Sequence, residues 1–159
     1  MLFRSVARGD DLDAREAMAL AATLAGLAFS NVGVALVHAL EYPVGGATGC
    51  SHGAGNGLLL PYVMRYNLPP RKAEFARVAE LLGEDVRGLS EDAAAERAVT
   101  AVERLRADIG IPARLREFGA KEEQLADFAA KAFAIKRILR VNPRTATVAD
   151  CEAIYRAAW

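Results

Sequence analysis

The chain contains two histidines, His38 and His52, which lie on either side of a glycine-rich segment that includes Gly45, Gly46 and Gly49. Two helices joined by such a turn can direct two imidazoles at one point. Neutral imidazole is a good ligand for iron, zinc, copper or nickel. The spacing alone leaves two interpretations open, a shared metal ion or two ordinary polar residues.

Two more side chains near the histidines could complete a metal site. Glu41 lies three residues after His38 and can share its helix face, and Cys50 lies two residues before His52. Both are more simply explained as surface or packing residues. Because neither Cys50 nor Ser51 has an identifiable base, we expect no nucleophilic triad or Cys–His pair.

Three glycines follow His52 at alternate positions, Gly53, Gly55 and Gly57. Glycines at a helix N-terminus can cradle a phosphate. A dinucleotide-binding fingerprint, however, should follow a strand inside a βαβ unit, and no strand is expected before these residues. We therefore expect the glycines to allow close packing of their helix against its neighbours.

Helical periodicity dominates the sequence, and no alternating strand of useful length is found, which predicts an all-α helical bundle. The uncharged segment 17–40 is either one buried central helix or two helices that break near Ser30 and Asn31. A loop is expected over 45–51, followed by a helix over 52–66 that is kinked at Pro61. Two further helices are expected, one from Lys72 to a stop at Gly83 and one that is capped by Ser90 and closed by Gly110. The last two expected helices are one through 125–133 and one that begins with a capping box of Thr147 and Asp150.

Apolar stripes predict which faces of these helices are buried. The stripes are Phe75, Val78, Ala79 and Leu82; Ala98, Val102, Leu105 and Ile109; Leu125, Phe128, Ala129, Ala132 and Phe133; and Cys151, Ile154, Tyr155 and Ala158.

Composition narrows the class of protein. The chain has 159 residues, is 53% hydrophobic and carries 20 basic and 20 acidic side chains, so one globular helical domain over 1–159 is expected and disorder is excluded. A net charge of +0 gives no field to concentrate phosphates, so no nucleic-acid partner is expected. Two cysteines in a chain with an ample core suggest free thiols and a cytoplasmic location.

Neither a signal peptide nor a membrane span is expected. Asp10, Asp11 and Asp13 separate the basic N-terminus from the apolar run, which breaks the signal-peptide pattern. The segment 17–40 is long enough to span a bilayer, but polar residues interrupt it and it ends in a glycine-rich turn without flanking Lys or Arg.

Longer stretches of the sequence resemble a known family. Residues 29–46 read FSNVGVALVHALEYPVGG, residues 51–67 read SHGAGNGLLLPYVMRYN, residues 141–144 read VNPR and the chain closes with IYRAAW. This pattern resembles the C-terminal helical domain of the iron-containing (group III) alcohol dehydrogenases, and its ending is similar to the lactaldehyde reductase branch. The resemblance implies that His38 and His52 are both metal ligands.

The resemblance also implies an activity. Enzymes of this family are NAD(P)-linked oxidoreductases in which Fe²⁺, or sometimes Zn²⁺, polarises the oxygen of a small alcohol or aldehyde during hydride transfer. By position, Phe29 and Val34 match residues that line the substrate pocket. No cofactor-binding residue is assigned, because the resemblance does not include the family's N-terminal nucleotide-binding α/β domain.

Several positions depart from the family pattern. Asp13 and Ala17 do not reproduce the Asp and His that supply the family's other two metal ligands. Tyr42 takes the place of a third histidine, which makes it a candidate for proton transfer or for the nicotinamide pocket. Ser51 replaces the proline of the motif, and Gly55 replaces a usual alanine. We therefore expect an incomplete metal site and no activity from the chain alone.

A second hypothesis is a stand-alone helical interaction module in which segment 17–40 packs against a partner or a second copy of the chain and the histidines are vestigial. Under either hypothesis, apolar surface left at the domain junction predicts a homodimer or larger assembly.

Overall fold

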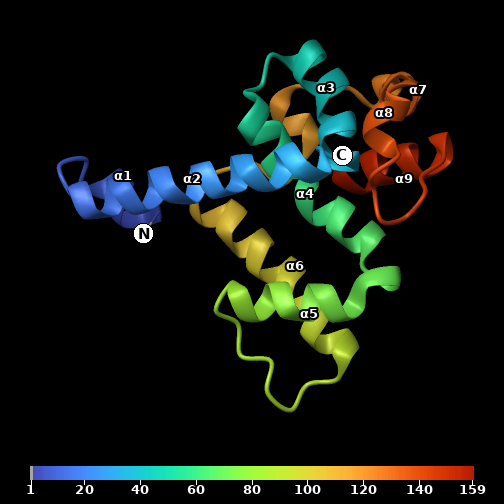
Figure 1. Ribbon diagram of the computed structural model, residues 1–159. Coiled ribbons are helices and arrows are strands. Elements are labelled where there is room, and N and C mark those ends of the chain that lie inside the picture. The colour runs from blue at the N-terminus through green and yellow to red at the C-terminus, as the bar shows by residue number, and fades with distance from the viewer. Residues whose placement is uncertain (1) are drawn as a thin grey trace. The chain divides into compact units, whose positions relative to one another are not determined.

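The computed structural model describes residues 2–159, and within that range it contains only helices and connecting loops, which confirms the all-α prediction (Figure 1). The α-helices are α1 Leu2–Ala7, α2 Leu12–Val32, α3 Leu36–Thr48, α4 His52–Asn67, α5 Lys72–Leu81, α6 Glu91–Asp108, α7 Leu125–Ala134, α8 Lys136–Leu139 and α9 Val148–Ala158. Short 3₁₀ turns lie at Pro69–Arg71, Leu115–Phe118 and Glu122–Gln124. The chain divides into two compact units, 1–34 and 35–159, which are described separately.

The first unit contains α1 and α2. Segment 17–40 forms two helices, as one of the two alternatives predicted, but α2 continues past Ser30 and Asn31 and ends at Gly33, whose φ is +81°. It continues because Ser30 Oγ and Asn31 Nδ2 donate hydrogen bonds to backbone carbonyls one turn earlier, at 2.7 Å each, which satisfies both polar groups inside the helix.

The α2 helix is largely exposed, and Ala14 is its one buried residue among the described residues. The alternative of a single buried central helix is therefore wrong. No single helix among residues 2–159 is long and apolar enough to cross a membrane, although α2 and α3 meet that length and composition test when they are taken together.

The main core of the second unit lies where α3 and α4 pack against α7 and α9. The rings of Phe128 in α7 and Tyr155 in α9 meet edge to face with their centroids 5.9 Å apart. The predicted stripe of α7 is buried except for half-buried Phe133. The largest fully buried side chains are Leu36, Leu40, Leu58, Leu59, Leu115, Leu125, Phe128 and Tyr155.

The predicted loop over 45–51 is shorter than expected. Helix α3 continues through Gly45 and Gly46 to Thr48, and it ends at Gly49, whose left-handed φ of +71° closes the helix with a bond from its N–H to Gly45 O at 2.9 Å. Thr48 Oγ1 also donates to Val44 O at 2.9 Å. Only three residues therefore separate α3 from α4.

A second, smaller core joins the C-terminal half of α4 to α5 and α6 through Met64, Ala79, Ala98 and Val99. The predicted helix ends are confirmed here, because Gly83 adopts a φ of +87° and Ser90 Oγ accepts a hydrogen bond from Ala93 N at 3.2 Å.

The predicted buried stripes of α5 and α6 are wrong in part, since Val78, Leu82 and Ile109 are exposed and Phe75, Val102 and Leu105 are half-buried. Helix α6 instead buries a face of small residues that approaches both α4 and α5, formed by Ala94, Ala95, Ala98, Val99 and Ala101.

The C-terminal segments hold the α3–α4 pair in place. The predicted capping box is confirmed, with Asp150 N donating to Thr147 Oγ1 at 3.1 Å and Thr147 N donating to Asp150 Oδ2 at 2.8 Å. Asn67 and Asn142 exchange two side-chain hydrogen bonds at 3.0 and 2.7 Å. The segment 141–144 is thus tied to the end of α4.

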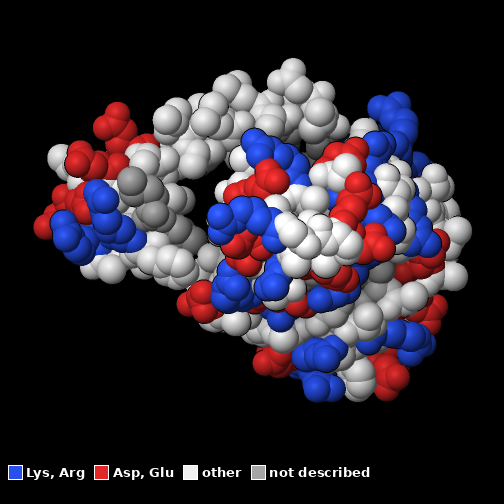
Figure 2. Space-filling model, turned by 90° about the horizontal axis from the view of Figure 1, so that it is seen from below, with Lys and Arg blue, Asp and Glu red and all other residues white. Residues whose placement is uncertain are grey.

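The surface and the thiols agree with the sequence expectations. Figure 2 shows acidic and basic side chains intermixed on the face that it presents. Both cysteines are free. Burial raises the pKa of the Cys151 thiol to about 11, so this group stays protonated at neutral pH.

We expect Tyr155→Phe to lower the free energy of unfolding by about 0.5–1.5 kcal/mol. The buried Tyr155 hydroxyl donates a 2.5 Å hydrogen bond to Leu40 O in α3, and phenylalanine removes this bond while it keeps the ring. Urea unfolding followed by circular dichroism measures the change. Tyr42→Phe removes an exposed hydroxyl and serves as the control, and equal stability of the two variants would contradict the prediction.

Candidate metal centre

The short turn between α3 and α4 brings the two histidines of the chain together. His38 Nδ1 lies 3.2 Å from His52 Nε2, and the two ring centroids are 5.2 Å apart. Two imidazole nitrogens bound to one divalent ion at about 2.0–2.1 Å are separated by about 3–3.4 Å. The spacing of these two nitrogens therefore fits a shared metal ion.

The environment of His38 favours the form of imidazole that binds metals. Partial burial lowers the pKa of His38, and the proximity of His52 lowers it further, while Glu41 opposes the shift. A depressed pKa keeps the ring neutral at physiological pH, with a lone pair available on one nitrogen.

Of the two ordinary roles that the sequence suggested for Glu41, a surface residue or a packing residue, the surface role is wrong. Its side chain is 4% exposed, and its Oε2 lies 2.5 Å from His52 Nδ1, within hydrogen-bond distance. His38 and Glu41 thus contact different nitrogens of the same imidazole. The only sequence signal for Glu41 was its position three residues after His38. That signal could not show that Glu41 would contact His52, the histidine of α4.

Glycines make the room for this carboxylate. A Cβ added to Gly55 would lie 2.8 Å from Glu41 Cγ and 3.2 Å from Cys50 Sγ, and a Cβ added to Gly45 would lie 2.6 Å from Glu41 Oε1. The packing interpretation of the alternate glycines is confirmed at Gly55, and also at Gly57, where a Cβ would lie 2.7 Å from Ile111 Cδ1. Gly53 has open space around it.

Two other residues surround His52. The Tyr42 ring stacks on the imidazole with centroids 5.8 Å apart and planes inclined by 14°, and Tyr42 is 44% exposed. Asn56 Nδ2 donates to His52 O at 2.9 Å and lies 3.1 Å from His52 Nε2. Sequence reasoning missed Asn56, for which the only signal was its position one turn after His52.

The remaining predicted site residues lie in the first unit or at its end. Phe29 is 54% exposed in α2, and Val34 is half-buried in the short connection that follows. Their substrate-binding role stays a prediction. Within residues 2–159, no group of three or more His, Cys, Asp or Glu side chains is arranged to hold a metal ion.

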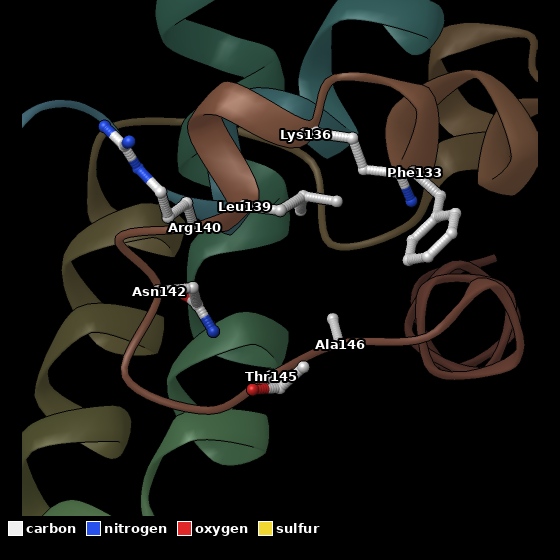
Figure 3. A pocket seen from close by; sticks show the side chains of 7 residues that line it. All are labelled: Phe133, Lys136, Leu139, Arg140, Asn142, Thr145 and Ala146. Atoms are coloured by element: carbon white, nitrogen blue, oxygen red, sulfur yellow. The ribbon is translucent and has the colours of Figure 1, made fainter.

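A separate cavity of about 400 Å³ lies between the α7–α8 segment and the loop before α9 (Figure 3). The Lys136 ammonium sits 2.8 Å from the centroid of the Phe133 ring, and Figure 3 shows the Arg140 guanidinium directed away from the other lining side chains. The lining consists of Phe133, Lys136, Leu139, Arg140, Asn142, Thr145 and Ala146, which includes none of the predicted site residues.

Comparison with known proteins identifies the family of the chain. The family described as the Fe-containing alcohol dehydrogenase family, C-terminal, matches residues 1–159. The chain belongs to this family. The structure is also similar to that of a 1,3-propanediol oxidoreductase, with a TM-score of 0.93 and 44% identity over 98% of this chain and 41% of that one.

Two curated relatives show the range of this iron-containing alcohol dehydrogenase family. An NAD-dependent methanol dehydrogenase of Bacillus methanolicus is 46% identical over 98% of this chain and 40% of its own length. The lactaldehyde reductase of Escherichia coli is 40% identical over 94% of this chain and 39% of its own length. The chain therefore spans about two fifths of these relatives.

We expect Gly55→Ala to lower the free energy of unfolding by about 1–3 kcal/mol, because the new methyl group would collide with Glu41. The loss should shrink in a Glu41→Ala background, where the colliding side chain is absent. Gly53→Ala is the matched control, since its Cβ meets open space in the same helix. Thermal or urea unfolding of Gly55→Ala, Glu41→Ala, the double variant and Gly53→Ala measures the energetic coupling between positions 41 and 55. An equal loss of stability from Gly55→Ala with and without Glu41 would refute the steric explanation.

Proposed function

We propose that this chain is the metal-binding helical part of an NAD(P)-dependent alcohol dehydrogenase or aldehyde reductase that acts on a small alcohol or aldehyde. The observation that carries the proposal is the 3.2 Å separation of His38 Nδ1 and His52 Nε2 in a region matched by the iron-containing family. The family match extends over residues 1–159, which supports treating both units as parts of one helical domain.

In this proposal, His38 and His52 hold Fe²⁺ or Zn²⁺. The bound ion would polarise the oxygen of the alcohol or carbonyl group and stabilise developing alkoxide charge. Because a catalytic site of this kind has at least three protein ligands, two histidines should hold the ion weakly. We therefore expect the chain alone to be catalytically incomplete.

The other side chains of the site would bind and orient the substrate. Tyr42 is exposed and stacked beside His52, so its hydroxyl is the candidate to move a proton to or from the substrate oxygen. By family position, Phe29 and Val34 would line the substrate pocket. Relatives named for methanol, 1,3-propanediol and lactaldehyde favour a small substrate, although another relative, 44% identical, is named for long-chain alcohols.

The nicotinamide cofactor is not assigned to residues of this chain. Residues 2–159 contain no strand and therefore no strand–loop–helix unit of the kind that cradles a dinucleotide. Two of the alternate glycines, Gly55 and Gly57, face Glu41 and Ile111 instead. Location in the cytoplasm remains a prediction from the sequence.

An interaction role for α2 is the second candidate, and one observation favours it. Leu20, Leu24 and Leu27 recur at helical spacing and are each more than half exposed, so they form an apolar row along α2. Such a row favours contact with a second copy of the chain.

The metal proposal predicts that the chain takes up Fe²⁺ or Zn²⁺ in anaerobic equilibrium dialysis. A His38→Ala, His52→Ala variant should bind the metal at least about tenfold more weakly, because both imidazole ligands are removed. Elemental analysis measures the bound metal. A Cys50→Ser, Cys151→Ser variant is the control, since it detects any metal that is bound through the two free cysteines. Uptake that follows the cysteines, or that is unchanged without the histidines, would overturn the proposal.

The association proposal predicts a homodimer or larger species in sedimentation velocity at micromolar concentration. Changing Leu20, Leu24 and Leu27 to Gln should shift the chain toward monomer, because the apolar row is lost. Leu81→Gln in α5 removes a leucine that is 71% exposed and should leave the sedimentation unchanged. A wild-type chain that sediments only as monomer would contradict the proposal.

A further inference from the structure

Glu41 is unusual among the charged residues of the chain because it is buried. It is 3% exposed, and the described residues that are buried and either polar or charged are Glu41 and Asn67. Removing a carboxylate from water is costly unless the group is paired and hydrogen-bonded. The bond from His52 Nδ1 to Glu41 Oε2 meets this requirement.

The Glu41 side chain is closely surrounded by residues of α3 and α4. Gly45 in α3 and Gly55 in α4 approach the side chain so closely that a Cβ at either position would collide with it. The residue before Glu41 in α3 is Leu40, whose backbone oxygen accepts a hydrogen bond from the hydroxyl of buried Tyr155. Tyr155 lies in the last helix, α9, so this bond ties α3 to the C-terminal part of the chain. Glu41 is therefore held by packing on several sides and bonded at one point, His52.

We propose that Glu41 is a positioning residue that holds His52 in the tautomer with its proton on Nδ1 and its lone pair on Nε2. A neutral imidazole has one N–H and one lone pair, and an ionised carboxylate can only accept. With an ionised Glu41 carboxylate and a neutral imidazole, the 2.5 Å contact therefore requires the proton on Nδ1. The lone pair then lies on Nε2, the nitrogen that is 3.2 Å from His38.

The geometry separates positioning from metal ligation. Glu41 contacts Nδ1 of His52, whereas His38 contacts Nε2, so the carboxylate acts through the imidazole and does not face the point that the two histidines share. Histidines that bind metals commonly donate their other N–H to such a carboxylate, and loss of that partner weakens metal binding. The consequence for metal binding rests on the proposed function, but the tautomer does not.

The first test reads the tautomer in the metal-free full chain. Two-bond ¹H–¹⁵N correlation spectra at pH 8 should show His52 protonated on Nδ1, and a His38→Gln variant assigns the two imidazoles. Glu41→Gln should shift His52 toward the Nε2–H form, because a neutral amide can also donate to Nδ1. Glu103→Gln is the matched control, since Glu103 pairs with Arg65 on α4 at 2.6 Å.

A wild-type His52 protonated on Nε2, or a tautomer that Glu41→Gln leaves unchanged, would overturn the proposal. The wild-type spectrum alone decides the matter if Glu41→Gln does not fold, as judged by circular dichroism.

The second test titrates the same proteins with Co²⁺ and follows the visible spectrum. Glu41→Gln should weaken binding about 10–100-fold and Glu103→Gln should not. If the wild-type chain shows the Nδ1–H tautomer but binds no Co²⁺, the positioning role stands and the proposed metal function fails. If Co²⁺ binds equally well to wild type and Glu41→Gln, the effect of Glu41 on metal binding is refuted and the metal function stands.

Discussion

The α3–α4 pair is organised around one buried polar contact, the bond between His52 Nδ1 and Glu41 Oε2 at 2.5 Å. A carboxylate in this position must keep a donor, because leaving it unpaired in the interior costs several kcal/mol or forces it to take up a proton. The three-residue connection between the helices and the small residues at 45 and 55 allow the two partners to meet. The close approach of His38 to the other edge of the His52 ring follows from the same arrangement.

Distant parts of the chain hold this arrangement rigid. Tyr155, 115 residues from Leu40, reaches the α3 backbone beside Glu41, and its ring packs on Phe128 of α7. At the other end of α4, Asn67 pairs with Asn142. The segment 141–144 therefore has a structural role, because Asn142 anchors the end of the helix that carries His52.

Two positions at which the sequence departs from the family pattern, Gly55 and Tyr42, lie next to Glu41 and His52. At Gly55, where the sequence resemblance implies an alanine, an alanine Cβ would lie 2.8 Å from Glu41 Cγ. Tyr42, where the resemblance implies a histidine, stacks its ring on His52. Gly55 approaches Glu41, so both differences lie beside the contact between Glu41 and His52.

The sequence by itself determined the helical class, the family resemblance, the histidine pair and the helix ends marked by Gly83, Ser90 and Thr147. Such ends could be predicted because capping depends on residues within one turn of each other. The tertiary structure decided that α3 runs to Thr48, that α6 buries its alanines, and that Glu41 is buried against His52. Burial depends on which helices meet, and the partners of Glu41 lie on another helix, so no local pattern could reveal that contact.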